Sequence, residues 1–160
     1  MAKKHGICED WYLQLKNEKD VDSMLEMAIK GIDFCLSNDF PSNDFIRKNF
    51  KGKMEHYGIH LDEVLNLVSE KKVVALGACT GIIEVKDYDV CEVFVKHNSK
   101  VKIMANENAF VMVDLFDGAE IEVYSDDNAT VCINRYGGTI IDKSQGESRI
   151  KIIEKNKKTY

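Results

Sequence analysis

Residues 108–115 read Asn-Ala-Phe-Val-Met-Val-Asp-Leu, residues 118–125 read Gly-Ala-Glu-Ile-Glu-Val-Tyr-Ser, and residues 128–135 read Asn-Ala-Thr-Val-Cys-Ile-Asn-Arg. Each segment starts with Asn or Gly, continues with Ala, and has Val or Ile at its fourth and sixth positions. The segments follow one another at a spacing of ten residues. A repeat of fixed length indicates stacked structural units that share one core.

The repeat extends well beyond these three segments. One aliphatic position recurs every ten residues, at Val73, Ile83, Val93, Ile103, Val113, Val123 and Ile133. Alternate residues around this position are apolar, which is the period of a strand with one buried face. Asn or Gly stands before the small residue at 98, 108, 118, 128 and 138. Because Asn and Gly tolerate positive φ, we expect these positions to form sharp corners.

Two architectures fit a ten-residue strand repeat: a β-solenoid (β-helix) with two strands per coil, and an antiparallel β-meander or sandwich. The outward residues favour the solenoid. They are more apolar in the repeats that start at 89, 109 and 129, and more charged in those that start at 99 and 119. A coil with two arms places alternate repeats on the same face. This arrangement predicts an apolar wall that contains Phe94, Phe110, Met112 and Cys132.

The opposite wall of the predicted solenoid carries charge. Lys100 and Lys102 are expected to lie beside Glu120 and Glu122, one coil further along. A meander would instead mix the two sets of outward residues on one surface. The apolar wall is the surface that we expect to bind the helical region, a second copy of the chain or another protein.

Residues 1–70 show helical spacing. Asp20 is a suitable N-cap for a helix that starts near Val21 and carries an apolar stripe to Leu36, and Ser42 can cap a short second helix. Leu61, Val64, Leu65 and Val68 suggest a third helix. The sequence therefore predicts an α+β protein with a helical cap (1–70) packed on a solenoid (71–142), followed by a final strand and a polar basic tail (143–160).

Charge and composition narrow the classes of function. The 160 residues include 22 Lys and Arg against 27 Asp and Glu, which gives a net charge of −5. An acidic chain lacks the basic face that nucleic-acid binding usually needs. The sequence shows no signal peptide and no apolar segment long enough for a membrane span, so we expect a cytoplasmic protein. The five cysteines are widely spaced, and we expect reduced thiols.

No motif assigns a catalytic residue, a cofactor or a metal. His56 and His60 have the spacing of metal ligands on a helix, but Gly58 between them disfavours that helix. Cys79 could form a nucleophilic pair with a histidine, although a small residue at a corner explains it equally well. The acidic residues from Asp114 to Asp127 lack the spacing of a calcium-binding loop.

The segments 107–113 and 127–133 resemble the Asn-Ala-x-Val-x-Val tens in small uncharacterised proteins of bacteriophages and bacterial mobile elements. The resemblance covers about the C-terminal half of the chain and implies a style of fold, without catalytic residues. We therefore expect a non-enzymatic protein-binding or assembly module that forms a homo-oligomer. The alternatives are an acidic inhibitor of a basic protein that acts on nucleic acid, and a cysteine-dependent enzyme.

Overall fold

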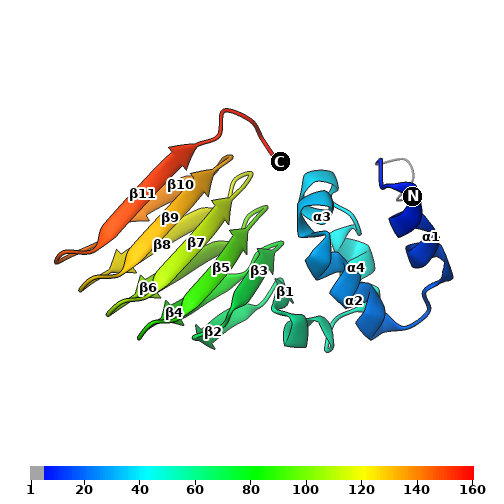
Figure 1. The fold of residues 1–160 in the computed structure, drawn as a ribbon, viewed down its shortest axis with the longest axis horizontal. Coiled ribbons are helices and arrows are strands. Elements are labelled where there is room, and N and C mark those ends of the chain that lie inside the picture. The colour runs from blue at the N-terminus through cyan, green and yellow to red at the C-terminus, as the bar shows by residue number, and fades with distance from the viewer. Residues whose placement is uncertain (1–5) are drawn as a thin grey trace. The chain divides into compact units, whose positions relative to one another are not determined.

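The computed structural model describes residues 6–160 and separates the chain into two compact units (Figure 1). The first unit holds the residues up to Tyr57 together with Thr159 and Tyr160, and the second holds Gly58–Lys158. Helices form the first unit and parallel strands form the second. The predicted α+β class is confirmed.

The first unit consists of four short helices and one turn of 3-10 helix. They are α1 (Glu9–Asn17), α2 (Val21–Lys30), α3 (Ile32–Asn38), α4 (Asn43–Asn49) and η2 (Met54–Tyr57). The buried side chains Leu25, Leu36 and Ile46 come from three of these helices. Helices of 7 to 10 residues are marginal alone, so this mutual burial stabilises them.

Both predicted N-caps are present. The Ser23 N–H donates to Asp20 Oδ2 at 2.8 Å, and this bond holds the pKa of Asp20 below its usual value. The Phe45 N–H donates to Ser42 Oγ at 3.4 Å. The predicted helix from Val21 to Leu36 is divided at Gly31, where an added Cβ would lie 3.0 Å from the Trp11 ring. The apolar stripe therefore continues across two helices.

The predicted third helix is wrong, because its residues form the strands β1 (Ile59–Leu61) and β2 (Val64–Val68). Over five residues an apolar pattern fits a helix or a strand equally well, and pairing with neighbouring strands decides between them. β1 pairs with β3, and β2 pairs with β4. The β unit consequently begins at Gly58, inside the segment that we expected to be the helical cap.

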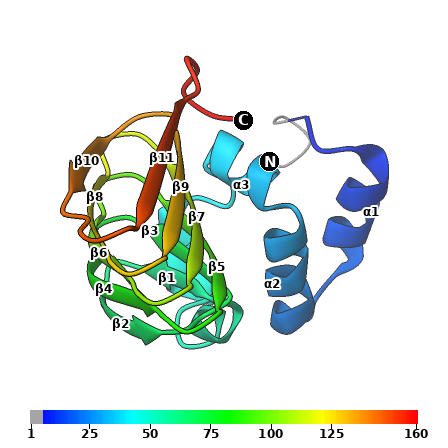
Figure 2. The same ribbon diagram turned by 60° about the vertical axis from the view of Figure 1, so that its left-hand side comes forward.

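The second unit is a parallel β-solenoid, as predicted, and the antiparallel meander is wrong. Its remaining strands are β3 (Lys72–Leu76), β4 (Thr80–Val85), β5 (Val90–Val95), β6 (Lys100–Ala105), β7 (Phe110–Leu115), β8 (Glu120–Ser125), β9 (Thr130–Arg135), β10 (Thr139–Asp142) and β11 (Arg149–Glu154). Sheet A has the order β1-β3-β5-β7-β9-β11, and sheet B has the order β10-β8-β6-β4-β2. Figure 2 shows the two sheets on opposite sides of the coil.

Each coil advances the register by 20 residues, so that equivalent side chains stack directly. Val93 pairs with Val113 in sheet A, and Ile103 pairs with Val123 in sheet B. These inward residues are almost fully buried. Burial of a Val or Ile side chain contributes about 1.5–3 kcal/mol, so the stacked columns supply most of the stability of this unit.

The corners differ from the prediction by one position. Positive φ falls on Asp87, His97, Glu107, Asp117 and Asp127, with values from 54° to 64°. Among the predicted corner residues, Gly138 alone has positive φ, with a value of 78°. The ladder between coils accounts for this: the His97 N–H donates to Asp117 Oδ2 at 3.2 Å, and the Glu107 N–H donates to Asp127 Oδ2 at 3.3 Å. These bonds offset the strain of a left-handed backbone.

Candidate binding surfaces

The outer face of sheet A carries the apolar residues that the sequence assigned to one wall. The register places Phe110 between Val90 and Thr130, and it places Met112 between Glu92 and Cys132. Val90 is 56% exposed and Met112 is 40% exposed, while Phe110 and Cys132 are partly exposed. We call Val90, Phe110, Met112 and Cys132 the apolar wall.

Phe94 was predicted for the same wall, but the structure gives it a different environment. Its side chain is only 8% exposed, and the Lys72 ammonium lies 5.6 Å from its ring centroid. In the next coils its column continues with Asp114 and Asn134, whose side chains form a hydrogen bond of 2.6 Å. The accessible part of the predicted surface therefore consists of Phe110, Met112 and Cys132.

The outer face of sheet B has the predicted charge pairs. Lys100 Nζ lies 3.8 Å from Glu120 Oε2, and Lys102 Nζ lies 3.4 Å from Glu122 Oε2. Tyr124 donates a hydrogen bond of 2.7 Å to Glu122, and this bond, with Lys102, lowers the pKa of that carboxyl. Exposed pairs of this kind contribute at most about 1 kcal/mol each. Their main effect is to neutralise the charge of this face locally.

Unbalanced negative charge lies instead at the corners that lead from sheet B to sheet A. Asp87, Glu107 and Asp127 occupy equivalent positions in successive coils, and Asp126 stands beside them. The hydrogen bond and the negative charge of Asp87 raise the pKa of the Glu107 carboxyl. We call Asp87, Glu107, Asp126 and Asp127 the acidic ridge.

The acidic residues do not form a metal site. Asp114 lies on sheet A, Glu120 and Glu122 lie on sheet B, and Asp117 and Asp127 are at successive corners of the coil. Within residues 6–160, no three His, Cys, Asp or Glu side chains are placed to hold a metal ion. His56, the first histidine of the candidate metal pair, lies in η2, whereas His60 lies in β1.

Cys79 has the environment of a structural thiol. It is fully buried, its Sγ donates to the Leu76 carbonyl at 3.2 Å, and its N–H donates to Ser99 Oγ at 3.2 Å. Burial raises the pKa of the Cys79 thiol, whereas a nucleophilic cysteine needs a lowered pKa and access to substrate. Burial also raises the pKa of Cys91, to about 12.

The histidines that could assist a cysteine have structural contacts. His97 Nδ1 accepts a hydrogen bond of 3.0 Å from the Gly77 N–H and so links two coils. His60 is only 6% exposed, and its Nδ1 lies 3.7 Å from Glu63 Oε2. Neither residue faces an open pocket among those described for residues 6–160.

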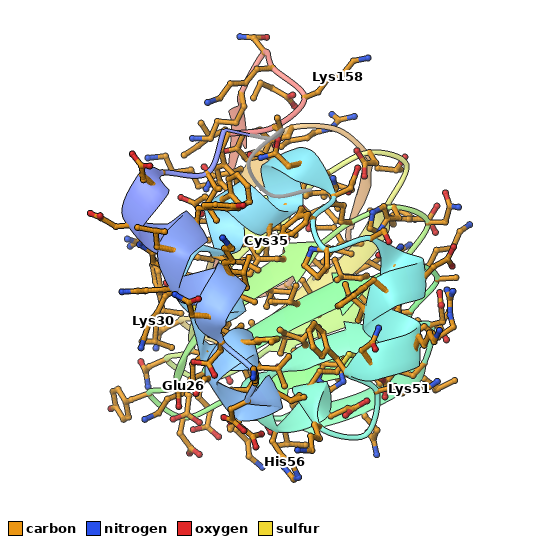
Figure 3. The ribbon with its side chains drawn as sticks, turned by 90° about the vertical axis from the view of Figure 1, so that its right-hand side faces the viewer. Glu26, Lys30, Cys35, Lys51, His56 and Lys158 are labelled. Carbon is orange, nitrogen blue, oxygen red and sulfur yellow. The ribbon has the colours of Figure 1, made fainter. Side chains whose placement is uncertain are left out.

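The helical unit offers a shallow, polar hollow between α1 and α2. Glu26 and Lys30 line it and lie one turn apart on α2 (Figure 3), with Lys30 Nζ 3.6 Å from Glu26 Oε2. The other lining residues are Gln14, Asn17, Glu18, Ser23 and Met27. An exposed charge pair in an open hollow holds no group poised for acid–base or nucleophilic chemistry.

Sequence reasoning missed one exposed surface. Val64 and Val68 were counted as part of a helix stripe, but they point outward from β2, where Val64 is 80% exposed and Val68 is 49% exposed. Ile82 lies beside them on β4 and is 37% exposed. The strict alternation of Val-Leu-Asn-Leu-Val was the available signal for a strand.

Comparison of the chain with protein-family models, with curated proteins and with solved structures finds no match. None of the helices in residues 6–160 has the length and hydropathy that a membrane crossing requires. The class that the fold itself defines is that of a short parallel β-solenoid joined to a small helical unit. Function must therefore be argued from the surfaces of this chain.

Proposed function

We propose that this protein is a cytoplasmic, non-enzymatic protein-binding module, and that the apolar wall of sheet A is its binding surface. The supporting observation is the exposure of Val90 and Met112, at 56% and 40%, in register on neighbouring strands. Contiguous exposed apolar side chains on a folded protein commonly mark an interaction site. The repeat resemblance suggests an origin in a bacteriophage or a mobile element.

The rigidity of the sheet favours this role. Parallel strands lie about 4.8 Å apart, so the side chains of the wall are held at fixed intervals by the ladder below them. A partner that binds a surface of this kind loses little free energy to ordering it. The Lys72–Glu92 ion pair, at 2.8 Å, borders the wall and gives it the polar rim that is typical of binding surfaces.

Self-association is part of the proposal. The last coil exposes residues that point into the core, because no further coil covers them. Ile152 pairs with Ile133 and points in the same direction, yet Ile152 is 45% exposed and Ile133 is fully buried. A second copy at this end or at the apolar wall would remove such surface from water.

A pair of methionine variants tests the binding surface. Met112 and Met104 both point outward, from β7 in sheet A and from β6 in sheet B. We expect Met112→Lys to abolish binding of proteins that the unmodified chain captures from a bacterial lysate, while Met104→Lys retains them. Self-association is measured in parallel by light scattering. The proposal fails if no captured protein, and no self-association, distinguishes the two variants.

The acidic ridge supports the second candidate, an inhibitor of a basic protein that acts on nucleic acid. The raised pKa of Glu107 reports carboxylates that repel one another, and a cationic partner would relieve that repulsion. The paired glutamates of sheet B offer no such gain.

A charge-matched comparison tests this candidate. The triple variant Asp87→Asn, Glu107→Gln, Asp127→Asn is expected to lose a salt-sensitive basic partner. A control that removes the same charge from the helical unit, with Glu9→Gln, Asp10→Asn and Asp33→Asn, should keep that partner. Equal binding by the two variants contradicts a role for the ridge.

A further inference from the structure

The strand β2 forms a free edge of sheet B. Within residues 6–160, β4 is the strand that pairs with it, and β2 ends the strand order. The Thr80 N–H donates to the Glu63 carbonyl at 3.0 Å, and the Ser69 N–H donates to the Glu84 carbonyl at 2.8 Å. Odd-numbered residues of this segment therefore face β4.

The even-numbered residues of β2 face away from the ladder. Successive residues of a strand direct their N–H and C=O groups to opposite sides. Val64, Asn66 and Val68 consequently present these groups to the free edge, where a further strand could pair with them. The 80% exposure of Val64 is consistent with an open edge at this point.

This edge lacks the charges that protect the other end of the solenoid. Proteins usually protect an edge strand from pairing with charged side chains. β11 carries Arg149, Lys151 and Glu154, and β10 places Asp142 at a position that pairs with the inward Val123. By contrast, β2 carries no charged residue and has apolar side chains on both faces.

The sequence of β2 is self-complementary. Val64-Leu65-Asn66-Leu67-Val68 reads the same in both directions. We propose that a second copy of this chain pairs with β2 through its own β2, antiparallel, about a twofold axis at Asn66. Val64 then lies opposite Val68 of the second copy, Leu65 lies opposite its Leu67, and the two Asn66 residues face each other.

The backbone groups agree with this register. The proposed pairing sets even-numbered residues opposite even-numbered residues, so the free N–H and C=O groups meet. Three such pairs that each exchange two bonds give about six hydrogen bonds. The two valine pairs extend the exposed apolar surface at Ile82 across the axis, and the interface is isologous, as in most homodimers. It is separate from the apolar wall on sheet A.

Opposite charges at residue 66 provide the test. We expect sedimentation of the full chain to show a species of twice 18.2 kDa at high concentration. Asn66→Asp and Asn66→Lys each place like charges opposite each other at the axis, and each should weaken the dimer at least about tenfold. An equimolar mixture of the two variants should restore it, because Asp then faces Lys. A folding defect would not be rescued by mixing.

Two controls isolate the edge. Asn108→Lys adds the same charge at an exposed corner, and Ile153→Lys adds it to the edge strand β11; both variants should dimerise like the unmodified chain. The inference is overturned if the unmodified chain remains a monomer, if either single Asn66 variant dimerises normally, or if the mixture stays monomeric. A dimer that is lost in Met112→Lys and kept in Asn66→Lys assigns the interface to the apolar wall and also overturns it.

Discussion

Replacement of Gly81 by alanine should detach β2 from the rest of the solenoid. Gly81 lies in β4 with φ of 114°, a value that side chains other than glycine rarely adopt. An added Cβ would lie 2.1 Å from the Leu65 carbonyl oxygen and 2.7 Å from the Leu65 nitrogen. Both atoms belong to the backbone of β2, so the clash cannot be relieved by rotation of a side chain.

The expected loss of stability follows from the contacts that this clash breaks. Displacement of β2 removes about two hydrogen bonds near Leu65, worth about 1 kcal/mol each. Exposure of the Leu65 side chain, now only 3% exposed, costs about 1.5–3 kcal/mol. Positive φ at alanine adds about 1 kcal/mol. The sum is about 4–6 kcal/mol, which is comparable with the whole stability of a small domain.

Denaturant unfolding measures this loss, and hydrogen exchange of the β2 amides locates it. Gly118→Ala is the matched control, because an added Cβ there would lie 3.6 Å from the nearest atom, the His97 carbonyl oxygen. We expect this control to change the free energy of unfolding by less than about 1 kcal/mol. The reasoning is refuted if Gly81→Ala unfolds within about 1 kcal/mol of the unmodified chain, or if both variants lose equal stability.

Three further predictions concern the core, the cysteines and the acidic ridge. Ile133→Ala should lower the free energy of unfolding by about 2–4 kcal/mol, because Ile133 is fully buried in a stacked column; an exposed-site control such as Ile153→Ala should change it little in the same denaturation experiment. In the native protein Cys8, which is exposed, should react rapidly with a disulfide reagent, whereas Cys79 and Cys91 should react only on unfolding; fast labelling of Cys79 would contradict its structural role. The raised pKa of Glu107 means that its stabilising effect is present at low pH and is lost as pH rises through the folded-state pKa; Glu107→Gln should therefore gain stability over the unmodified chain at neutral pH and lose that advantage in acid, and equal pH profiles for the two proteins would disprove the repulsion.

The solenoid could be predicted because its core repeats. Val93, Val113 and Ile133 occupy the same inward position in successive coils, so the sequence carries the constraint several times. The sorting of outward residues was also readable, since it requires only the parity of the repeat. The Lys100–Glu120 and Lys102–Glu122 pairs confirm that parity.

The first coil could not be predicted in the same way. Its strand β2 shares no repeat position with the Asn-Ala segments, and Gly81 reaches it through a close backbone contact instead of a side-chain pattern. The corners failed for a related reason. Asp117 and Asp127 accept hydrogen bonds from the coil before them, so the positive φ falls on residues whose side chains bridge coils. Contacts between coils are invisible in a ten-residue window.

The candidate surfaces were only partly predictable, because outward residues are not fixed by the core. An outward position tolerates most side chains, and the chain places Thr130, Lys102 and Tyr124 at such positions without disturbing the stack below. Exposed apolar residues there gain nothing from folding. Their presence at Val64 on one sheet and at Val90 and Met112 on the other therefore requires an explanation outside the monomer. Two such surfaces on opposite sheets allow the chain to pair with a copy of itself at one and still bind a different protein at the other.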